Sequence, residues 1–359
     1  MVEQRIRNAK VEGSTPFTGT TFQTNTHPTA LCKLPNAVSL QALNALIAAD
    51  MNTVDGVIRT QLRSEVVLVN QIAEYIIGGG GKRLRPALVL LSAGALGHRG
   101  PQQHTLAAVV EFIHTATLLH DDVVDDSDLR RGQDTANALF GNAASVLVGD
   151  FLYSRAFQMM VSVGIPRVME VLSDATNVIA EGEVLQLMNC NDPDISEDDY
   201  LRVIRYKTAK LFEAAGRLGA LVAGVDRATE DALGAYGMYL GTAFQLIDDV
   251  LDYDATAEET GKNVGDDLAE GKPTLPLLYA MQQGTAEEST LVREAILNGD
   301  ATHFNEILTA IRRTGALDYT RTQAAAEAEK ARAALSALPE GPYRDALQAL
   351  TVFAVQRNH

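Results

Sequence analysis

Positive charge is scarce in this sequence, which has 30 lysine and arginine residues against 46 aspartate and glutamate residues and a net charge of −16. A surface that binds nucleic acid non-specifically needs a basic face, so this balance argues against that class of protein. A small anionic substrate stays compatible with the composition. Its site would need locally gathered lysine and arginine residues, or a bound metal ion.

Cysteine is also scarce. Cys32 and Cys190 are far apart and neither belongs to a CxxC pair, which excludes a disulfide framework and a cysteine zinc site and fits a reducing compartment. Long apolar runs are lacking, since no stretch approaches the ~20 residues of a membrane span. The N-terminus has no apolar segment typical of a secretory signal. We therefore expect a soluble cytoplasmic protein.

The first 37 residues differ from the rest of the chain. Seven threonines fall between Ser14 and Ala30, among prolines and glycine, with no sustained apolar period. We interpret residues 1–37 as a disordered or loosely attached N-terminal extension. A transit peptide and an artefact of an upstream start are alternatives, since Met51 offers an internal start.

From residue 38 onward the sequence predicts an all-α fold. Alanine, leucine, glutamate, glutamine and arginine dominate, apolar residues recur at spacings of three and four, and no alternating strand pattern is visible. Length alone suggests two domains of about 150 residues each. A large helical fold can form one core, however, and we expect a single domain over 38–359. The expected helices cover residues 38–50, 54–77, 86–96, 103–126, 136–163, 166–188, 197–224, 228–253, 275–283, 288–298, 301–314, 317–337 and 342–356.

Two acidic segments have the same helical spacing. The first is LLHDDVVDD, residues 118–126, and the second is FQLIDDVLDY, residues 244–253. Residues three and four apart share one face of a helix, so the first segment is predicted to project Asp121, Asp122 and Asp125 together. The corresponding polar residues of the second segment are Gln245, Asp248, Asp249 and Asp252.

The apolar neighbours of these aspartates indicate that both helices are largely buried. Carboxylates on one buried face repel each other unless a cation lies between them. Mg²⁺ suits such a site, because it takes one or two carboxylates together with substrate phosphates. A solvated acidic surface is the alternative, and it fits two such segments less well than one. An EF-hand is excluded, because Leu129 and Arg130 follow Asp128 where further ligands and a glycine are required.

A basic segment, GGGGKRLRP at residues 78–86, places Lys82, Arg83 and Arg85 before a proline that suits the first turn of a helix. Backbone amides and fixed cations at a helix start favour a bound anion. A P-loop is excluded because Arg83 stands where that motif needs serine or threonine. A basic surface turn is the alternative. Further cations near the acidic segments are Arg130, Arg131, Lys207, Lys262 and Lys272.

Taken together, these segments resemble the trans-isoprenyl diphosphate synthases. The resemblance covers residues 38–359 and rests on GGGKRLRP, EFIHTATLLHDDVVDDSDLRRG, KTA at 207–209, FQLIDDVLDY and GDDLAEGKPTLP. It implies a large single-domain helical bundle of the isoprenoid synthase type with a central cavity. It also implies a homodimeric prenyltransferase that uses Mg²⁺, with Mn²⁺ as a substitute. The substrates would be isopentenyl diphosphate and an allylic diphosphate such as farnesyl diphosphate.

The resemblance assigns expected roles to single residues. The expected metal ligands are Asp121, Asp122, Asp125, Asp248, Asp249 and Asp252. The residues expected to bind isopentenyl diphosphate are Lys82, Arg85, His114 and Arg131. Those expected to bind the allylic diphosphate are Arg130, Lys207, Lys262 and Lys272. Lys207, Thr208 and Gln245 are expected to be catalytic, with Thr208 and Gln245 beside the developing cation. The sequence departs from short-chain relatives at Gln186, where they carry an aspartate.

The length of the prenyl product is expected to depend on Ala116 and Thr117, one turn before Asp121. Short-chain relatives carry bulky aromatic residues near these positions, so small residues imply a deep tunnel and a long product. The pattern is most similar to that of family members that make octaprenyl diphosphate for the ubiquinone side chain, with the product passed to membrane enzymes. Octaprenyl, nonaprenyl and decaprenyl products stay open, as does the allylic primer. Ala116→Phe is predicted to shorten the product.

Two other functions compete with this interpretation. A terpene cyclase could share the helical fold and a metal motif, but it need not keep both the basic segment and a second full aspartate motif. An inactive regulatory subunit would be expected to lack some of the aspartates or basic residues. His120, beside the first aspartates, is a further candidate for a general base, although a structural role is favoured.

Overall fold

The computed structural model describes residues 40–130, 132–254 and 265–357. The N-terminal extension, Arg131 and Lys262 lie outside these residues. The helices are α2 (Leu40–Gln61), α3 (Val67–Gly78), α4 (Leu84–Ala95), α5 (Pro101–Val124), α6 (Ala136–Phe140), α7 (Asn142–Ser162), α8 (Pro166–Asn189), α9 (Glu197–Ile204), α10 (Lys210–Ala223), α11 (Arg227–Asp254), α13 (Asp266–Ala269), α14 (Leu275–Gln283), α15 (Ala286–Asn298), α16 (Phe304–Thr314), α17 (Ala316–Ala334) and α18 (Pro342–Gln356). A π-helical turn, η2 (Arg205–Ala209), joins α9 to α10, and a 3₁₀ turn, η3 (Leu335–Ala337), follows α17.

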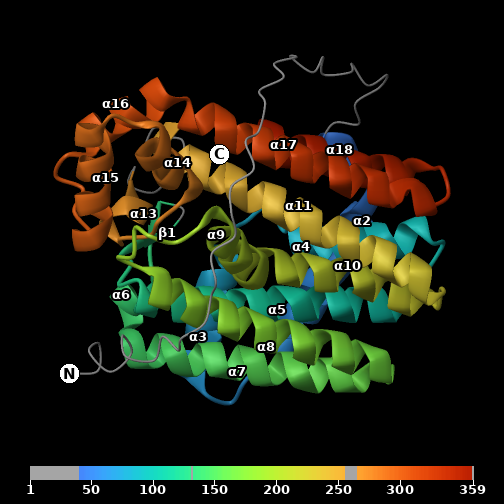
Figure 1. Ribbon diagram of the computed structural model, residues 1–359. Helices are drawn as coiled ribbons and strands as arrows, with labels where there is room; N and C mark the ends of the chain where they lie inside the picture. Colours follow the sequence, from blue (N-terminus) through green and yellow to red (C-terminus); the bar gives the residue numbers. More distant parts are fainter. Residues whose placement is uncertain (1–39, 131, 255–264, 358–359) are drawn as a thin grey trace, which may run out of the picture. The chain divides into compact units, whose positions relative to one another are not determined.

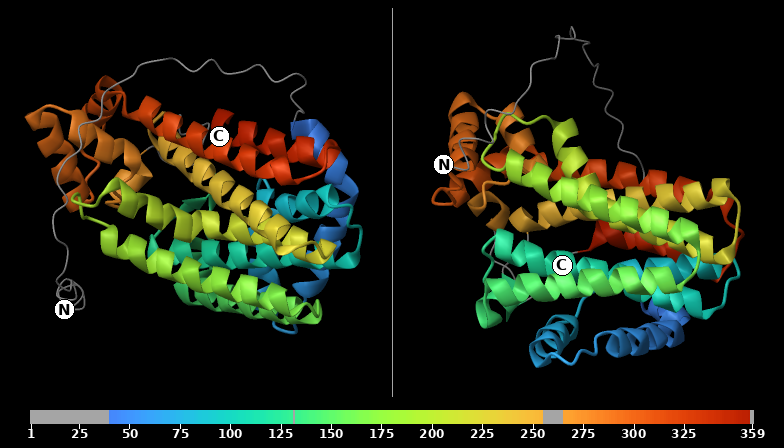
Figure 2. Two further views of the ribbon diagram at one scale, coloured as in Figure 1. Left: turned by 45° about the vertical axis from the view of Figure 1, so that its right-hand side comes forward. Right: turned by 90° about the horizontal axis from the view of Figure 1, so that it is seen from below.

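The fold is all-α, as the sequence predicts. Long helices lie side by side in both views, with α5 against α4 and α7, and α11 against α10 and α17 (Figures 1 and 2). The short helices α13–α16 gather at one end of this bundle. The described strands are β1 (Leu129–Arg130) and β2 (Gln133–Asp134), which form a small antiparallel hairpin directly after the first acidic segment.

The predicted helix boundaries are wrong in the first part of the chain. The break expected at residues 51–53 does not occur, because α2 continues to Gln61. The chain breaks at 62–66 instead, where Asn70 accepts a hydrogen bond from the Ser64 backbone at 3.0 Å and the Ser64 hydroxyl accepts one from the Val66 backbone at 3.1 Å. Side-chain bonds of this kind compete with helix formation, and the apolar pattern does not register them.

Other predicted helices are divided by local backbone geometry. The helix expected over 136–163 is split into α6 and α7 at Gly141, whose φ of 86° is accessible to glycine at no steric cost. The helix expected over 197–224 contains η2, where the repeat widens for one turn. Such π-helical turns occur mostly at functional sites. Lys207 and Thr208 lie in this turn.

Close contact between α10 and α11 depends on glycine. A Cβ atom on Gly237 would lie 2.2 Å from the carbonyl oxygen of Phe212, and one on Gly241 would lie 2.7 Å from the Cα atom of Ala209. No side chain fits at such distances, so the two helices approach backbone to backbone. This approach brings Thr208, in η2 just before α10, beside Gln245 on α11, with 3.0 Å between the Thr208 hydroxyl and Gln245 Oε1.

Candidate active site

A cavity of about 700 Å³ lies between the ends of α4, α5, α8, α9, α10 and α11 and the segment around α13. Most of the residues that the sequence singles out line it. They are Lys82, Arg85, His114, Thr117, Asp121, Asp125, Arg130, Lys207, Thr208, Gln245, Asp248, Asp249, Asp252 and Lys272. Segments as far apart in the chain as Gly81 and Arg357 therefore contribute to one site.

Asp122 is an exception among the aspartates of the first motif. Asp121 and Asp125 are four residues apart and line the cavity, whereas Asp122 is rotated by about 100° on the helix. Its carboxylate is fully buried, and its Oδ1 atom accepts hydrogen bonds from Arg130 Nε at 2.7 Å and Nη2 at 2.6 Å. The prediction that three aspartates project together is therefore wrong for Asp122, because Arg130 of the following hairpin binds its carboxylate outside the cavity lining.

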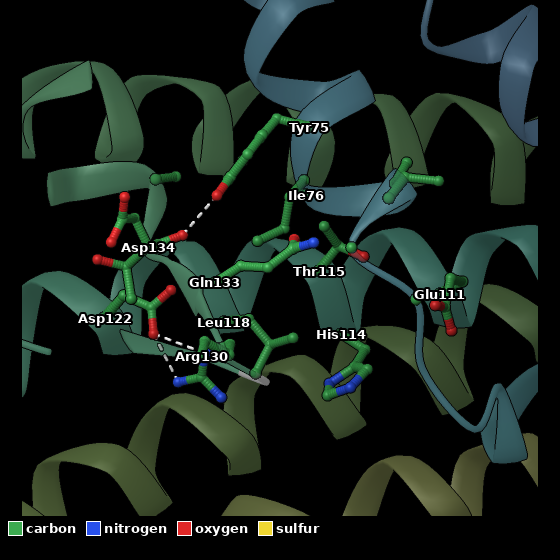
Figure 3. A pocket seen from close by; sticks show the side chains of 15 residues that line it. Tyr75, Ile76, Glu111, His114, Thr115, Leu118, Asp122, Arg130, Gln133 and Asp134 are labelled. Carbon is green, nitrogen blue, oxygen red and sulfur yellow. Dashed lines mark hydrogen bonds and ion pairs between the residues drawn. The ribbon is translucent and has the colours of Figure 1, made fainter. Parts of the chain in front are cut away.

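Asp122 borders a second, smaller pocket of about 40 Å³, with Tyr75, Gln133 and Leu118 around it (Figure 3). Its Oδ2 atom is buried and has no hydrogen-bond partner among the described residues. Figure 3 shows the Arg130 guanidinium between Asp122 and His114, and both Arg130 and His114 also border the large cavity. Asp122 thus orients Arg130 from behind.

The three aspartates of the second motif have different partners. Asp248 Oδ1 is 2.7 Å from Arg357 Nη2, at the end of α18. Asp249 is 3% exposed, and it accepts hydrogen bonds from the Tyr200 hydroxyl and, at 2.9 Å, from Gln245 Nε2. Asp252 lines the cavity one turn beyond Asp248. Asp248 and Asp252 thus repeat the four-residue spacing of Asp121 and Asp125.

Two lysines connect the elements across the cavity. Lys272 Nζ, on the loop before α14, is 3.2 Å from Asp125 Oδ2 on α5 and also pairs with Glu270. Lys207 Nζ, in η2, is 2.6 Å from Glu183 Oε2 and 3.6 Å from Asp121 Oδ2. The first acidic motif therefore faces a cation from each of two distant segments.

Burial and crowding of like charges shift the proton affinities in the cavity. Burial raises the pKa of Asp121, with Lys207 opposing the shift and Asp125 adding to it. Burial raises the pKa of Asp249 to about 8, and the neighbouring charge of Asp267 adds to the shift. Burial alone would lower the pKa of Lys207, but Asp121 and Glu183 outweigh it, so the pKa is raised and the ammonium is retained. Such perturbed groups in one cleft are typical of functional sites.

The donor set fits a divalent metal that is shared with an anionic ligand. No three histidine, cysteine or carboxylate side chains among the described residues are grouped closely enough to hold a metal ion alone. Asp121 and Asp125 form a carboxylate pair on one cavity wall, and Asp248 and Asp252 form another. One or two carboxylates with phosphate oxygens and water make the usual coordination of Mg²⁺.

Lys82 and Arg85 lie beside aromatic rings at another part of the wall. Lys82 Nζ is 5.9 Å from the ring centroid of Phe244, and the Arg85 guanidinium is 4.5 Å from that of Phe212. Both cations line the cavity, near Arg130 and His114 of the same lining. The basic segment is therefore part of the site and not an isolated surface turn.

Several polar lining residues were not recognised from the sequence, among them Glu183, Tyr200 and Arg357. Glu183 stands in EGEVLQLM, the segment that departs from short-chain relatives at Gln186. It is three residues before Gln186 and therefore on the same face of the helix, which is the one local signal for it. Tyr200 and Arg357 are buried polar residues in otherwise unremarkable helices. No local pattern marks them, because their partners are 49 and 109 residues away in the chain.

Of the two expected chain-length residues, Thr117 lines the cavity and Ala116 does not. Ala116 is fully buried, and its carbonyl oxygen lies 3.3 Å from the position that a Cβ atom on Gly149 of α7 would take. His120, one turn further on, also faces α7, with Nε2 3.2 Å from the carbonyl oxygen of Val146. The role of Ala116 in chain length stays a prediction.

Comparison with known proteins identifies the family. Residues 66–312 match the Polyprenyl synthetase family. The chain belongs to the polyprenyl synthetase family. It is 58% identical over 322 residues to the octaprenyl diphosphate synthase of Escherichia coli K12, a match that covers 89% of this chain and 100% of that relative.

Other members of the polyprenyl synthetase family extend the comparison. The chain is 45% identical to a geranyl-diphosphate-specific all-trans-nonaprenyl-diphosphate synthase of Rhodobacter capsulatus, over 88% of this chain and 98% of that one. A Caulobacter crescentus CB15 polyprenyl synthase, crystallised with calcium and isoprenyl diphosphate, is 47% identical, with a TM-score of 0.87 over 91% of this chain and 100% of that one. The predicted fold type is thereby confirmed.

Proposed function

We propose that this protein is a long-chain all-trans polyprenyl diphosphate synthase of the octaprenyl class, which supplies quinone side chains. It condenses isopentenyl diphosphate repeatedly onto an allylic diphosphate such as farnesyl diphosphate. The observation that carries the proposal is the pairing of Asp121 and Asp125 with Asp248 and Asp252 across one cavity that also gathers the basic residues. The 58% identity to the octaprenyl enzyme of E. coli supports the product class.

The allylic diphosphate is assigned to the end of the cavity where the acidic motifs face each other. Asp121, Asp125, Asp248 and Asp252 would hold Mg²⁺, with Mn²⁺ as a substitute. When bound, the metal supplies positive charge to the diphosphate and makes it a better leaving group. Lys207 and Lys272 are placed to bind the same diphosphate, because each already neutralises an aspartate of the first motif. Arg130 and, from the sequence, Lys262 complete this set.

Isopentenyl diphosphate is assigned to the basic wall formed by Lys82, Arg85 and His114, with Arg131 added from the sequence. The described members of this set line the cavity together with the Phe212 and Phe244 rings. The aromatic rings hold the two cations in place. They also present an apolar surface to the five-carbon unit.

The reaction needs no protein nucleophile. It needs stabilisation of the negative charge on the leaving diphosphate and of the positive charge on the allylic carbon. The allylic carbon–oxygen bond breaks, and the lysines and Arg130 stabilise the diphosphate that leaves. The double bond of isopentenyl diphosphate forms the new carbon–carbon bond, and a proton then passes to the released diphosphate. Thr208 and Gln245 present oxygen atoms beside the allylic cation. Catalysis therefore comes from positioning and preorganised charge.

The protein is also proposed to form a homodimer through an exposed apolar surface on α7 and α8. Val184, Leu187 and Met188 form an exposed apolar stripe on α8, with exposed fractions of 57%, 59% and 48%, and the neighbouring α7 exposes Leu147 and Val161. An exposed apolar surface of this kind marks an interaction site, and a homodimer would cover it. No described helix is long and apolar enough to cross a membrane.

The proposal includes a cytoplasmic location and transfer of the product to membrane enzymes. The cytoplasmic location expected from the cysteine content is tested by fractionating cells that produce the protein. The apolar product would be passed to membrane enzymes, because a polyprenyl chain has no stable place in water.

The deciding experiment is product analysis of the purified protein with Mg²⁺, isopentenyl diphosphate and farnesyl diphosphate. The expected result is a series of prenyl diphosphates that ends at a single long product, and its loss when EDTA removes the metal. A cyclic hydrocarbon would identify a terpene cyclase instead. Complete inactivity of the purified single chain would favour a regulatory subunit and contradict the proposal.

A further inference from the structure

A chain of hydrogen bonds runs from the buried Tyr200 of helix α9 to the cavity. The Tyr200 hydroxyl donates to Asp249 Oδ2, and Gln245 Nε2 donates to Asp249 Oδ1 at 2.9 Å. The Thr208 hydroxyl in turn donates to Gln245 Oε1 at 3.0 Å. The network therefore links α9, α11 and η2, and it ends at the two residues placed beside the reacting carbon.

The inner part of this network is shielded from water. Tyr200 is 4% exposed and Asp249 is 3% exposed. Burial, followed by the charge of Asp249, raises the pKa of Tyr200 well above its ordinary value, so the hydroxyl keeps its proton and remains a donor. A hydrogen bond in a poorly hydrated site is stronger than one in water, and the loss of its donor is costly.

The network determines which end of the Gln245 amide faces the cavity. An amide has a donor end and an acceptor end. Asp249 Oδ1 accepts from the Nε2 end of Gln245, so the Oε1 end is directed toward Thr208. The oxygen end carries partial negative charge, which stabilises a nearby carbocation, while the NH₂ end would destabilise it.

Both oxygens of Asp249 are bonded within the protein, and Tyr200 holds the one that Gln245 does not use. We propose that Tyr200 is a positioning residue for prenyl transfer, which acts through Asp249 to keep the Gln245 amide oxygen turned toward the allylic cation. This inference rests on the proposed function and adds a residue to it. It also gives Asp249 an orienting role in place of the metal-binding role that the sequence predicts.

The test is Tyr200→Phe, which keeps the ring and removes only the hydroxyl. With farnesyl and isopentenyl diphosphate, kcat is expected to fall on the order of 10- to 100-fold. The KM values of both substrates and the Mg²⁺ concentration for half-maximal activity should stay within about twofold, because no group that binds diphosphate or metal has changed. Tyr236→Phe is the matched control, since its buried hydroxyl donates to the Leu347 carbonyl at 2.7 Å, away from this network. It should leave kcat unchanged.

A double-mutant cycle separates positioning from general structural support. If Tyr200 acts through Gln245, Tyr200→Phe should cause no further loss of kcat in a Gln245→Ala background. An equal loss in both backgrounds would overturn the proposal, as would a Tyr200→Phe enzyme with the kcat of the unmodified protein. Inactivity of the unmodified protein would instead contradict the proposed function, so the two failures are distinguishable.

Asp249→Asn provides a second variant in case Tyr200→Phe folds poorly. Asparagine keeps the shape of the side chain but can turn its own NH₂ group toward Gln245, which allows the Gln245 amide to flip. The expected result is a lower kcat with an unchanged Mg²⁺ requirement. A raised Mg²⁺ requirement, with kcat restored at saturating metal, would show that Asp249 is a metal ligand and would overturn the orienting role.

Discussion

At the residue scale, neighbouring aspartates of one motif have different surroundings. Asp125 lines the large cavity and pairs with Lys272, whereas Asp122 is buried behind the wall and pairs with Arg130. Helical spacing does not separate them, because residues three apart share a face; their partners do, since Arg130 of β1 binds one and Lys272 before α14 binds the other. Under the proposed function, the two carboxylates therefore serve different purposes: Asp125 would hold the metal, and Asp122 orients an arginine.

This difference predicts distinct effects of isosteric substitution. Asp125→Asn should raise the Mg²⁺ concentration needed for half-maximal activity and lower kcat on the order of 100-fold. Asp122→Asn should leave the Mg²⁺ requirement nearly unchanged and raise the KM of the allylic diphosphate, because Arg130 loses its charged partner. Metal titrations of both variants check this. A large rise in the Mg²⁺ requirement of the Asp122 variant would contradict the assignment.

Of the two residues predicted to control product length, Thr117 is the one that lines the cavity. Thr117→Phe should place an aromatic ring in the cavity one turn from Asp121 and shorten the product by one or more isoprene units, with near-normal consumption of isopentenyl diphosphate. Ala116→Phe, predicted from the sequence to shorten the product, should also lower Tm, because overpacking a fully buried position costs about 1–3 kcal/mol. Chromatography of the products and thermal unfolding compare the two variants. An unchanged product from Thr117→Phe would show that the tail leaves the cavity elsewhere.

At the scale of the elements, the contact between α10 and α11 sets the distance between Thr208 and Gln245. Glycine lets the two backbones approach, and the π-helical turn η2 brings Thr208 to the side that faces Gln245. The helices can approach this closely because Gly237 and Gly241 have no side chain. A methyl group at either position should therefore affect both stability and catalysis.

Gly237→Ala tests this dependence. Its new Cβ would lie 2.2 Å from the Phe212 carbonyl oxygen, so the helices must separate, at a cost of about 1–3 kcal/mol in the free energy of unfolding. We expect a lower Tm together with a lower kcat. Gly56→Ala is the control, because nothing lies within 4 Å of its Cβ position in α2. That change should be neutral or stabilise the protein by about 0.4–1 kcal/mol; equal Tm values for the two variants would contradict the packing argument.

At the scale of the whole molecule, the proposed homodimer would bury the apolar stripe on α8. Leu187→Glu puts a charge into that stripe, and light scattering should then report a monomer at concentrations where the unmodified protein is a dimer. Leu297→Glu, on α15, changes a residue that is 46% exposed and lies outside the stripe, so it should leave the dimer intact. A dimeric Leu187→Glu variant would place the interface on another surface.

The helical class, both acidic motifs and the main basic residues of the cavity could be predicted from sequence because they depend on local periodicity and on strongly patterned segments. Helix ends at Gly141 and at 62–66 were missed or misplaced, since they depend on backbone conformation and on side-chain bonds of Ser64 and Asn70. The hairpin after the first motif was not predicted, because strands of two residues are too short to show an alternating pattern of apolar and polar residues.

Local patterns in the sequence were enough to predict that carboxylates and cations would meet in a helical protein that handles diphosphates, because such side chains have few other uses in apolar helices. Which aspartates enter the cavity and which do not depends on the packing of distant segments. The tertiary structure also revealed Tyr200, Glu183 and Arg357, whose roles depend on partners brought together from distant segments. Helical spacing tells which residues share a face; the packing of other helices decides what that face meets.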